Sequence, residues 1–380
     1  MQFELTDDQR AIQDMARQFT EDQITPFAAQ WDKEKTWPAH IQSKAGALGF
    51  GGIYVGEQHG GVGLSRVDAA LIFEQLSMGC PSTAAMISIH NMVTWMIDSF
   101  AGDDLRARVV PALSSFDNMG SYCLTEPGAG SDAASLRTKA VRDGDSYILD
   151  GAKAFISGAG VSDYYVVMAR TGDAGAKGIS CFLVEKGTDG LSFGAEEEKL
   201  GWHSQPTRMV QFDGCRIPAS NRIGEEGDGF KIAMAGLDGG RLNIAACSLG
   251  GAQRALDETI AYVRDRKQFG QAIADFQNTQ FALADMGTAL SAARLMLYQG
   301  ADHVSRKIPA ATASAAMAKR FVTDTAFDVT NKALQLHGGY GYLMDYPIER
   351  ILRDLRVHQI LEGTNEIMRV VISRHLLKEG

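Results

Sequence analysis

Hydrophobic spacing divides the chain into three segments. In residues 1–116, apolar positions recur every three or four residues, with glycine and proline at the joints, which predicts amphipathic helices. In residues 117–227 the pattern changes to short runs rich in β-branched and aromatic residues, such as Tyr164–Met168 and Ser180–Val184. The helical spacing returns in residues 228–380. The elements are therefore expected in the order helices, strands, helices.

The middle segment contains four Asp-Gly pairs, which are strong signals for a turn between antiparallel strands. The pairs are Asp143-Gly144, Asp150-Gly151, Asp189-Gly190 and Asp213-Gly214. We interpret each pair as a turn that separates two strands, which predicts an antiparallel sheet.

The last segment predicts a bundle of long helices. It is rich in alanine, and one set of apolar positions steps by three and four, so its members share a helix face. The residues of this face are Leu283, Met286, Leu290, Ala293 and Leu297. A later helix is expected to end at Gly338, because glycine tolerates the left-handed backbone that closes a helix.

The order of these segments predicts the fold class. Strands and helices do not alternate, so a parallel sheet with crossover helices is not expected. The pattern instead predicts an α+β fold with an N-terminal helical domain (1–116), a central antiparallel β domain (117–227) and a C-terminal helical bundle (228–380).

Composition excludes several classes of function. The net charge is -9, the pI is about 5.4, and no long run of like charges occurs, which argues against a nucleic-acid or polybasic membrane surface. The five cysteines are widely spaced, so neither a zinc site nor a redox dithiol is predicted. No metal site and no membrane span are expected, and the first residues lack the features of an export signal.

A glycine-rich stretch, Gly128–Ala133, matches the spacing of a dinucleotide-binding fingerprint, and Asp150 follows near the usual acidic position. That fingerprint requires a helix after the glycines, whereas the residues that follow predict a strand, a turn and a second strand. A nicotinamide cofactor is therefore disfavoured. Such a loop still brings backbone N–H groups close to a flat or anionic cofactor, although an ordinary hairpin loop explains it equally well.

Five separated motifs resemble the acyl-CoA dehydrogenase family in order and spacing, over essentially the whole chain. They read YCLTEPGAGSD, AFISG, RKQFG with a later glutamine, QLHGGYGY, and ILEGTNE followed by ISR. The resemblance implies three domains of the kind described above, the last one a four-helix bundle. It also implies FAD as cofactor, an acyl-CoA substrate, an electron-transferring flavoprotein as partner, and a homotetramer whose subunits share flavin contacts.

The resemblance assigns roles to residues at matching positions. Glu362 is expected to be the catalytic base. The expected FAD contacts are Tyr122, Cys123, Leu124, Thr125, Gly130, Ser131, Phe155, Ile156, Ser157, Arg266, Gln268, Phe269, Phe276, Gln277, Gln335, Leu336, His337, Gly338, Gly339, Thr364, Asn365 and Glu366. The expected substrate contacts are Ser131, Asp238, Gly239, Gly240, Arg241, Gly363 and Arg374.

Several of these residues also have purely structural interpretations. Arg266 with Lys267 would be a solvated helix end, Ser131 a turn residue, and Asp238–Arg241 a helix-packing site. His337 precedes two glycines, so we expect it to place the backbone rather than to carry a proton. Glu362 itself would be an exposed acid near a helix cap.

The environment of Glu362 favours a base. The acid stands between an apolar pair and Gly363-Thr364, ahead of a predicted helix. The helix N-terminus favours the anion by about 0.3–1 kcal/mol, whereas desolvation raises a carboxyl pKa by as much as about 3–5 units. Desolvation is expected to win once an acyl chain is bound, which suits removal of a proton from carbon.

Two departures from the family pattern bear on substrate choice. Phe155 and Leu361 stand where many family members carry tryptophan and tyrosine, and the smaller residues suit a short or branched acyl group. The favoured substrate is isobutyryl-CoA, oxidised to methacrylyl-CoA in valine catabolism, with short-chain and 2-methylbutyryl substrates as alternatives. An acyl-CoA oxidase on the same fold and a flavin- or CoA-binding scaffold without turnover remain rivals. A bacterial cytoplasmic protein, or a mitochondrial matrix protein after processing, is expected.

Overall fold

The computed structural model describes residues 4–377. The outer bounds of the first and last predicted domains, residues 1 and 380, lie outside this range. The first helices are α1 (Asp7–Gln23), α2 (Ala28–Glu34), α3 (His40–Ala47), α4 (Arg66–Gly79), α5 (Pro81–Phe100) and α6 (Asp103–Ser114). The Thr6 side chain caps α1 and pairs with Gln9 in a capping box, so the first helix begins at Asp7 rather than at the start of the chain.

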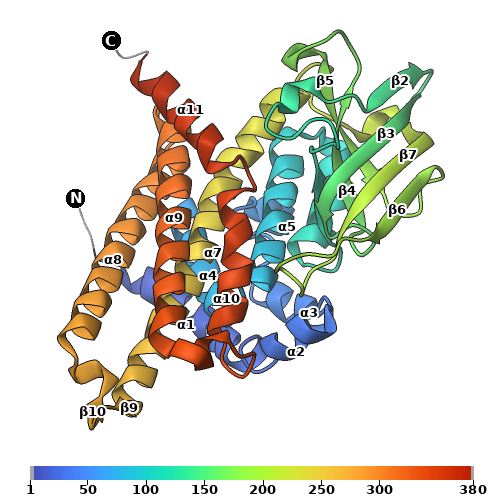
Figure 1. Ribbon diagram of the computed structural model, residues 1–380. Helices are drawn as coiled ribbons and strands as arrows, with labels where there is room; N and C mark the ends of the chain where they lie inside the picture. Colours follow the sequence, from blue (N-terminus) through green and yellow to red (C-terminus); the bar gives the residue numbers. More distant parts are fainter. Residues whose placement is uncertain (1–3, 378–380) are drawn as a thin grey trace.

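The strands follow in the middle of the chain (Figure 1). They are β1 (Gly120–Cys123), β2 (Lys139–Asp143), β3 (Ser146–Ser157), β4 (Tyr164–Arg170), β5 (Ile179–Glu185), β6 (Leu191–Glu196), β7 (Thr207–Pro218) and β8 (Arg222–Ile223). They form one eight-stranded sheet in the order β6-β7-β3-β2-β4-β5-β8, with β1 paired to β4. The sheet is mixed: most pairs are antiparallel as predicted, but β1 runs parallel to β4, and β2 meets β4 in a parallel bridge.

Two of the four predicted Asp-Gly turns are wrong. Asp143-Gly144 turns the chain between β2 and β3, and Asp189-Gly190 precedes β6. Asp150-Gly151 and Asp213-Gly214 instead lie inside β3 and β7, where the ladder between the two strands is irregular. The Gly214 N–H donates to Asp150 Oδ1 over 2.7 Å. These two pairs therefore mark a bulge in a strand pair, which glycine also favours.

The remaining elements form the helical bundle. They are α7 (Gly229–Asp265), the hairpin β9 (Lys267–Gln268) and β10 (Gln271–Ala272), α8 (Gln277–Ser305), α9 (Ala311–His337), α10 (Ile348–Arg356), the short 3-10 helix η7 (Val357–Gln359) and α11 (Asn365–Leu376). The long helices α7, α8 and α9 pack on one another, α10 packs on α7 and α9, and α11 packs on α9. As predicted, a glycine with positive φ, Gly338, closes α9.

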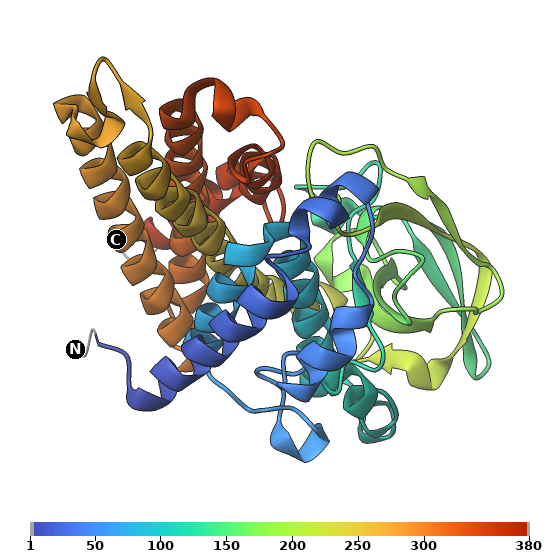
Figure 2. The same cartoon turned by 90° about the horizontal axis from the view of Figure 1, so that it is seen from below.

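Helix α5 joins the two halves of the molecule. Figures 1 and 2 place it between the bundle and the sheet, and it contacts α7 on one side and β1 on the other. The α+β fold is therefore confirmed, with helices before and after a central sheet. All five cysteines lie buried as free thiols. Within residues 4–377, no helix combines the length and the apolar character that crossing a membrane requires.

Candidate active site

Glu362 lies in the short loop between η7 and α11, outside both helices. Its φ is 54° and that of Gly363 is 90°, so two consecutive residues adopt left-handed backbone and turn the chain sharply. A positive φ is uncommon for a residue with a side chain and is frequent at functional sites. Thr364 then caps α11 by accepting the Ile367 N–H over 3.3 Å. The predicted position of the acid ahead of the helix is confirmed.

The Glu362 carboxylate points onto the backbone of α7. A Cβ built on Gly240 would lie 2.2 Å from Glu362 Oε2 and 2.9 Å from Met92 Sδ, so only glycine leaves space there. Oε2 is buried and has no hydrogen-bond partner among the described residues. Burial raises the Glu362 pKa to about 7, against the opposing charges of Lys319 and Arg241. The desolvation expected from a bound acyl chain is thus already present in the fold.

A buried lysine fixes the loop that carries Glu362. Lys319 on α9 donates through Nζ to Gly363 O over 2.9 Å and to Asn365 Oδ1 over 2.8 Å. Asn365 in turn donates to Thr323 Oγ1 and Asp324 Oδ1. Sequence reasoning missed Lys319. Its spacing from Ala315 and Val322 on α9 puts it on the buried helix face, which was the available signal.

The predicted substrate residues of α7 also meet this loop. Arg241 is buried, donates through Nη1 to Asp238 Oδ1 over 2.6 Å, and approaches Glu362 O with Nε at 3.4 Å. Asp238 accepts a second hydrogen bond from Thr312 Oγ1. Arg374, by contrast, lies exposed in the last turn of α11, and the described structure shows no contact between it and these residues.

A buried histidine anchors η7 behind the acid. Trp202 Nε1 donates to His358 Nε2 over 3.1 Å, and His358 Nδ1 lies 2.7 Å from Ser248 Oγ on α7. Since Nε2 accepts, the proton of a neutral ring is on Nδ1 and is donated to the serine. Burial lowers the His358 pKa to about 3, which keeps the ring neutral. No role was predicted for His358 from the sequence.

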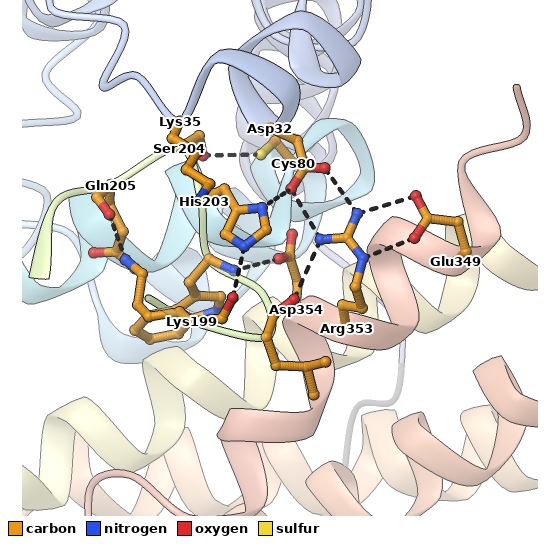
Figure 3. Close-up of polar contacts among 12 residues, drawn as sticks. Asp32, Lys35, Cys80, Lys199, His203, Ser204, Gln205, Glu349, Arg353 and Asp354 are labelled. Carbon is orange, nitrogen blue, oxygen red and sulfur yellow. Dashed lines mark hydrogen bonds and ion pairs between the residues drawn. The ribbon is translucent and has the colours of Figure 1, made fainter. Parts of the chain in front are cut away.

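Ion pairs hold α10, which leads into η7. Figure 3 shows Arg353 between the carboxylates of Asp32 on α2 and Glu349 on α10, with closest distances of 2.7 Å to each. The neighbouring Asp354 accepts the Trp202 N–H over 2.6 Å, and burial raises its pKa to about 6. The segment that precedes Glu362 is therefore held by residues from the first helices, the β-domain loop and the bundle.

The β domain contributes Tyr122 and the loop after β1. The Tyr122 hydroxyl is buried without a partner among the described residues, and burial together with the nearby Glu362 raises its pKa. The side chains of Cys123, Leu124 and Ile156 belong to the hydrophobic core, so any contact of these residues with a ligand would come from their backbone. Gly130 and Ser131 are exposed. As expected, a strand and not a long helix follows this loop, so the nicotinamide fingerprint lacks its context.

A buried ion pair supports the same loop. Lys153 Nζ lies 2.7 Å from Glu126 Oε1 and donates to Leu124 O over 3.1 Å. Glu126 also accepts the Arg137 and Thr138 N–H groups. Two residues further along β3, Phe155 has a φ of 59° and a side chain that is 68% exposed. The backbone beside it is held by the Ala154 N–H, which donates to Thr125 O.

A second group of predicted residues lies far from Glu362. The β9–β10 hairpin carries Phe269, which is 95% exposed, next to Arg266 and Phe276. It adjoins the C-terminus of α9, where Tyr262 donates to His337 O over 3.2 Å. Eighteen residues of α9 separate His337 from Lys319, or about 27 Å at the helical rise. One chain therefore does not bring the two groups together (Figure 1).

The remaining predicted cofactor residues divide between these two regions. Ser157 lies at the end of β3, and its carbonyl accepts from Ser121 Oγ. Glu366 is exposed in the first turn of α11. Gln268, Gln277, Gln335 and Gly339 are exposed near the hairpin and the end of α9, and Leu336 is half-buried there. His337 is buried and stacks on Tyr262, which fits its structural interpretation.

Comparisons with known proteins cover the chain. Models of the acyl-CoA dehydrogenase N-terminal, middle and C-terminal domains match residues 6–117, 121–215 and 227–377. A mitochondrial isobutyryl-CoA dehydrogenase from Dictyostelium discoideum is 55% identical over 99% of this chain and 90% of the relative. The solved butyryl-CoA dehydrogenase from Megasphaera elsdenii has a TM-score of 0.97 and 37% identity, over 99% of this chain and 100% of its own.

A solved FAD complex of PigA matches the whole of both chains with a TM-score of 0.96 and 31% identity. The domain order, the fold and the sequence all agree. This chain belongs to the acyl-CoA dehydrogenase family of FAD-dependent oxidoreductases.

Proposed function

We propose that this chain oxidises isobutyryl-CoA to methacrylyl-CoA, with Glu362 as the base that removes the α-proton. The observation that carries this proposal is the Oε2 atom of Glu362, which is buried, has no hydrogen-bond partner in residues 4–377 and lies against Gly240. With a pKa near 7, the carboxylate is available near neutral pH and is a stronger base than an ordinary glutamate.

The chain's own groups prepare the substrate for loss of this proton. Among the described residues, no acceptor pairs with the Glu362 amide N–H, so it is free to donate to the thioester carbonyl. A donor aimed at a developing oxyanion is typically worth about 10²- to 10³-fold in rate. FAD, when bound, supplies the acceptor for the hydride that leaves the β-carbon. Loss of one proton and one hydride leaves the α,β double bond.

The β-domain face fits a flat cofactor. Phe155 is an exposed aromatic residue in strained backbone, at the irregular stretch of the β3–β7 pair. Packing among the described residues explains neither the exposure nor the backbone strain, whereas an aromatic ring system stacked there would bury the side chain. Phe155 to Ser157 and the loop from Tyr122 to Ser131 are thus the residues that would hold the isoalloxazine ring, with Thr364 to Glu366 beside them.

The distant group is explained by a homotetramer. Because Arg266, Phe269 and the end of α9 lie about 27 Å from the Glu362 loop along α9, they would hold the FAD of a neighbouring subunit. The exposed ring of Phe269 and the open backbone at Gly338 and Gly339 support such a contact. Electrons would then pass to an electron-transferring flavoprotein.

The substrate assignment is tested with a panel of acyl-CoAs. We expect isobutyryl-CoA to bleach the bound flavin under anaerobic conditions with a higher kcat/KM than butyryl-CoA, 2-methylbutyryl-CoA or octanoyl-CoA. The likeness to the Dictyostelium relative supports this order, while the likeness to butyryl-CoA dehydrogenase favours a short straight chain. Equal or faster bleaching by butyryl-CoA or octanoyl-CoA would reject isobutyryl-CoA as the preferred substrate.

Reoxidation of the reduced flavin distinguishes a dehydrogenase from an oxidase. After reduction by substrate, the flavin should stay reduced in air until an electron-transferring flavoprotein is added. Rapid reoxidation by oxygen alone in a stopped-flow experiment would favour the oxidase.

The raised pKa of Glu362 predicts the pH dependence. The carboxylate is the active form, so kcat/KM for flavin bleaching should rise as the pH increases through about 7 and then level off. An unperturbed glutamate would titrate near 4.5 and give a flat profile from about pH 6 to 8. A flat profile in that range would show that Glu362 is not the titrating base.

Substitution of Gly240 by alanine tests the placement of the carboxylate. The new methyl group would overlap Glu362 Oε2 and displace it, although alanine is otherwise favoured in a helix. A displacement of about 1 Å is enough to lower the bleaching rate by about 10²-fold. Gly287→Ala on α8 is the control, since a Cβ there meets no atom of the described residues within 4 Å. Equal rates in the two variants would contradict the predicted contact.

A further inference from the structure

Arg66 is a buried cation that the proposed mechanism does not use. It is the first residue of α4 and is 8% exposed. Its guanidinium lies over the Tyr54 ring, 3.6 Å from the centroid, and over the Trp95 ring, 4.9 Å from the centroid. Nη1 is buried and has no hydrogen-bond partner among the described residues. A buried arginine usually pairs with a carboxylate, but here two aromatic faces hold the guanidinium.

Arg66 lies beside the residues that surround the Glu362 carboxylate. A Cβ on Gly239 would be 2.5 Å from Arg66 Nη1, just as a Cβ on Gly240 would be 2.2 Å from Glu362 Oε2. Because consecutive Cα atoms are about 3.8 Å apart, the cation and the carboxylate flank the same short stretch of α7. Glycine at both positions makes room for the two side chains.

Tyr54 and Met92 complete this region. The Tyr54 hydroxyl accepts from Asn243 Nδ2 over 2.9 Å, which fixes the ring under the guanidinium. Burial raises the Tyr54 pKa, with Arg66 opposing the shift and Glu362 adding to it, so the hydroxyl lies within the field of both charges. Met92 Sδ lies beside Gly240, next to the carboxylate.

We propose that Arg66, clamped between Tyr54 and Trp95, ends the acyl cavity and limits the length of the acyl chain. The inference rests on the proposed function and names the residue that sets its substrate class. On this proposal, a short branched acyl group would lie between Glu362 and the guanidinium. A longer straight chain would have to push the cation out of its aromatic clamp.

The physical reason for an arginine is its resistance to displacement. An aliphatic end wall gives way by rotating about its side-chain bonds, whereas the planar guanidinium is held by both ring faces. Moving it deeper into the apolar interior would cost further desolvation. We expect its stem and planar head to take the space that the terminal carbons of a hexanoyl group would need.

The test compares chain-length preference in Arg66→Ala and Arg66→Met. We expect the ratio of kcat/KM for hexanoyl-CoA to that for isobutyryl-CoA to rise by about 10-fold or more in Arg66→Ala, in line with the value of a few methylenes in an apolar pocket. Arg66→Met keeps more of the volume, so its shift should be smaller and in the same direction. If the alanine variant folds poorly, Arg66→Met still tests the proposal.

Binding is measured separately from turnover. Each substitution is combined with Glu362→Gln, and the Kd of isobutyryl-CoA and hexanoyl-CoA is determined by calorimetry on the FAD-loaded protein. The Arg66 substitutions should lower the Kd and the KM for hexanoyl-CoA more than they change kcat. Arg350→Ala is the control for losing a buried arginine, since Arg350 is also 8% exposed and its Nε has no hydrogen-bond partner in the part of the chain that the structure describes.

The outcomes separate the two proposals. If the wild-type flavin is bleached by isobutyryl-CoA but the hexanoyl-to-isobutyryl ratio is unchanged in both Arg66 variants, or shifts equally in Arg350→Ala, Arg66 does not end the cavity and the proposed function stands. If no acyl-CoA bleaches the wild-type flavin, both proposals fail.

Discussion

Replacement of Glu362 by glutamine is expected to slow flavin bleaching by isobutyryl-CoA by about 10²- to 10⁴-fold, the usual contribution of a positioned general base. The amide has nearly the same shape but accepts no proton. The variant should still bind FAD and acyl-CoA, because a pKa of about 7 means that the uncharged acid is already populated at this position near neutral pH. Anaerobic stopped-flow spectroscopy of the flavin measures the rate.

The control for this experiment is Asp328→Asn. Asp328 is an exposed carboxylate on α9, away from the Glu362 loop, and its loss should leave the rate unchanged. A Glu362→Gln variant that bleaches at a tenth of the wild-type rate or faster would remove Glu362 from the mechanism. Loss of FAD or of acyl-CoA binding would instead show that the residue is needed to build the site.

Lys153→Met is expected to lower the free energy of unfolding by about 3–5 kcal/mol, the cost of leaving the partner of a buried ion pair unpaired. Lys153 is fully buried and Glu126 is 7% exposed. Without the ammonium group, the partners left to Glu126 among residues 4–377 are the Arg137 and Thr138 amides. Chemical denaturation of the wild type and the variant, both loaded with FAD, measures the difference.

Two further variants show whether burial is the cause. Lys35 pairs with Glu198 at the same 2.7 Å distance, but the Lys35 side chain is half exposed and that of Glu198 is largely exposed, so Lys35→Met should have little effect. The double variant Lys153→Met/Glu126→Gln should regain part of the lost stability, because no charge is then left buried. An equal loss of unfolding free energy in Lys35→Met and Lys153→Met would show that burial of the ion pair does not increase its contribution to stability.

Sequence patterns and structure agree best where the information is local. The three-segment order follows from periodicity, and the position of Glu362 ahead of α11 follows from Gly363 and the Thr364 cap. The Asp-Gly pairs show the limit of such reasoning. A glycine with positive φ suits a hairpin turn and a bulge equally well, and only the pairing of β3 with β7 decides that Asp150-Gly151 and Asp213-Gly214 lie within strands.

The family resemblance pointed to Asp238–Arg241 and Glu362, and the structure brings them together. It left out Lys319, His358, Tyr54 and Arg66, which position the Glu362 loop or border the same stretch of α7. Lys319 was detectable from its place on a buried helix face. For Arg66 the sequence holds no local signal, since a lone arginine after a helix cap is usually solvated.

The sequence by itself determined which segments form helices and strands, and it put an acid at a break before the last helix, because spacing, capping and glycine act over a few residues. Only the tertiary structure decided that α7 presents two glycines to that acid, that a lysine from α9 holds its loop, and that an arginine from α4 lies alongside. These residues are far apart in the chain. Their meeting depends on how α4, α5, α7 and α9 pack, and that packing raises the pKa of a glutamate that would otherwise be an ordinary surface acid.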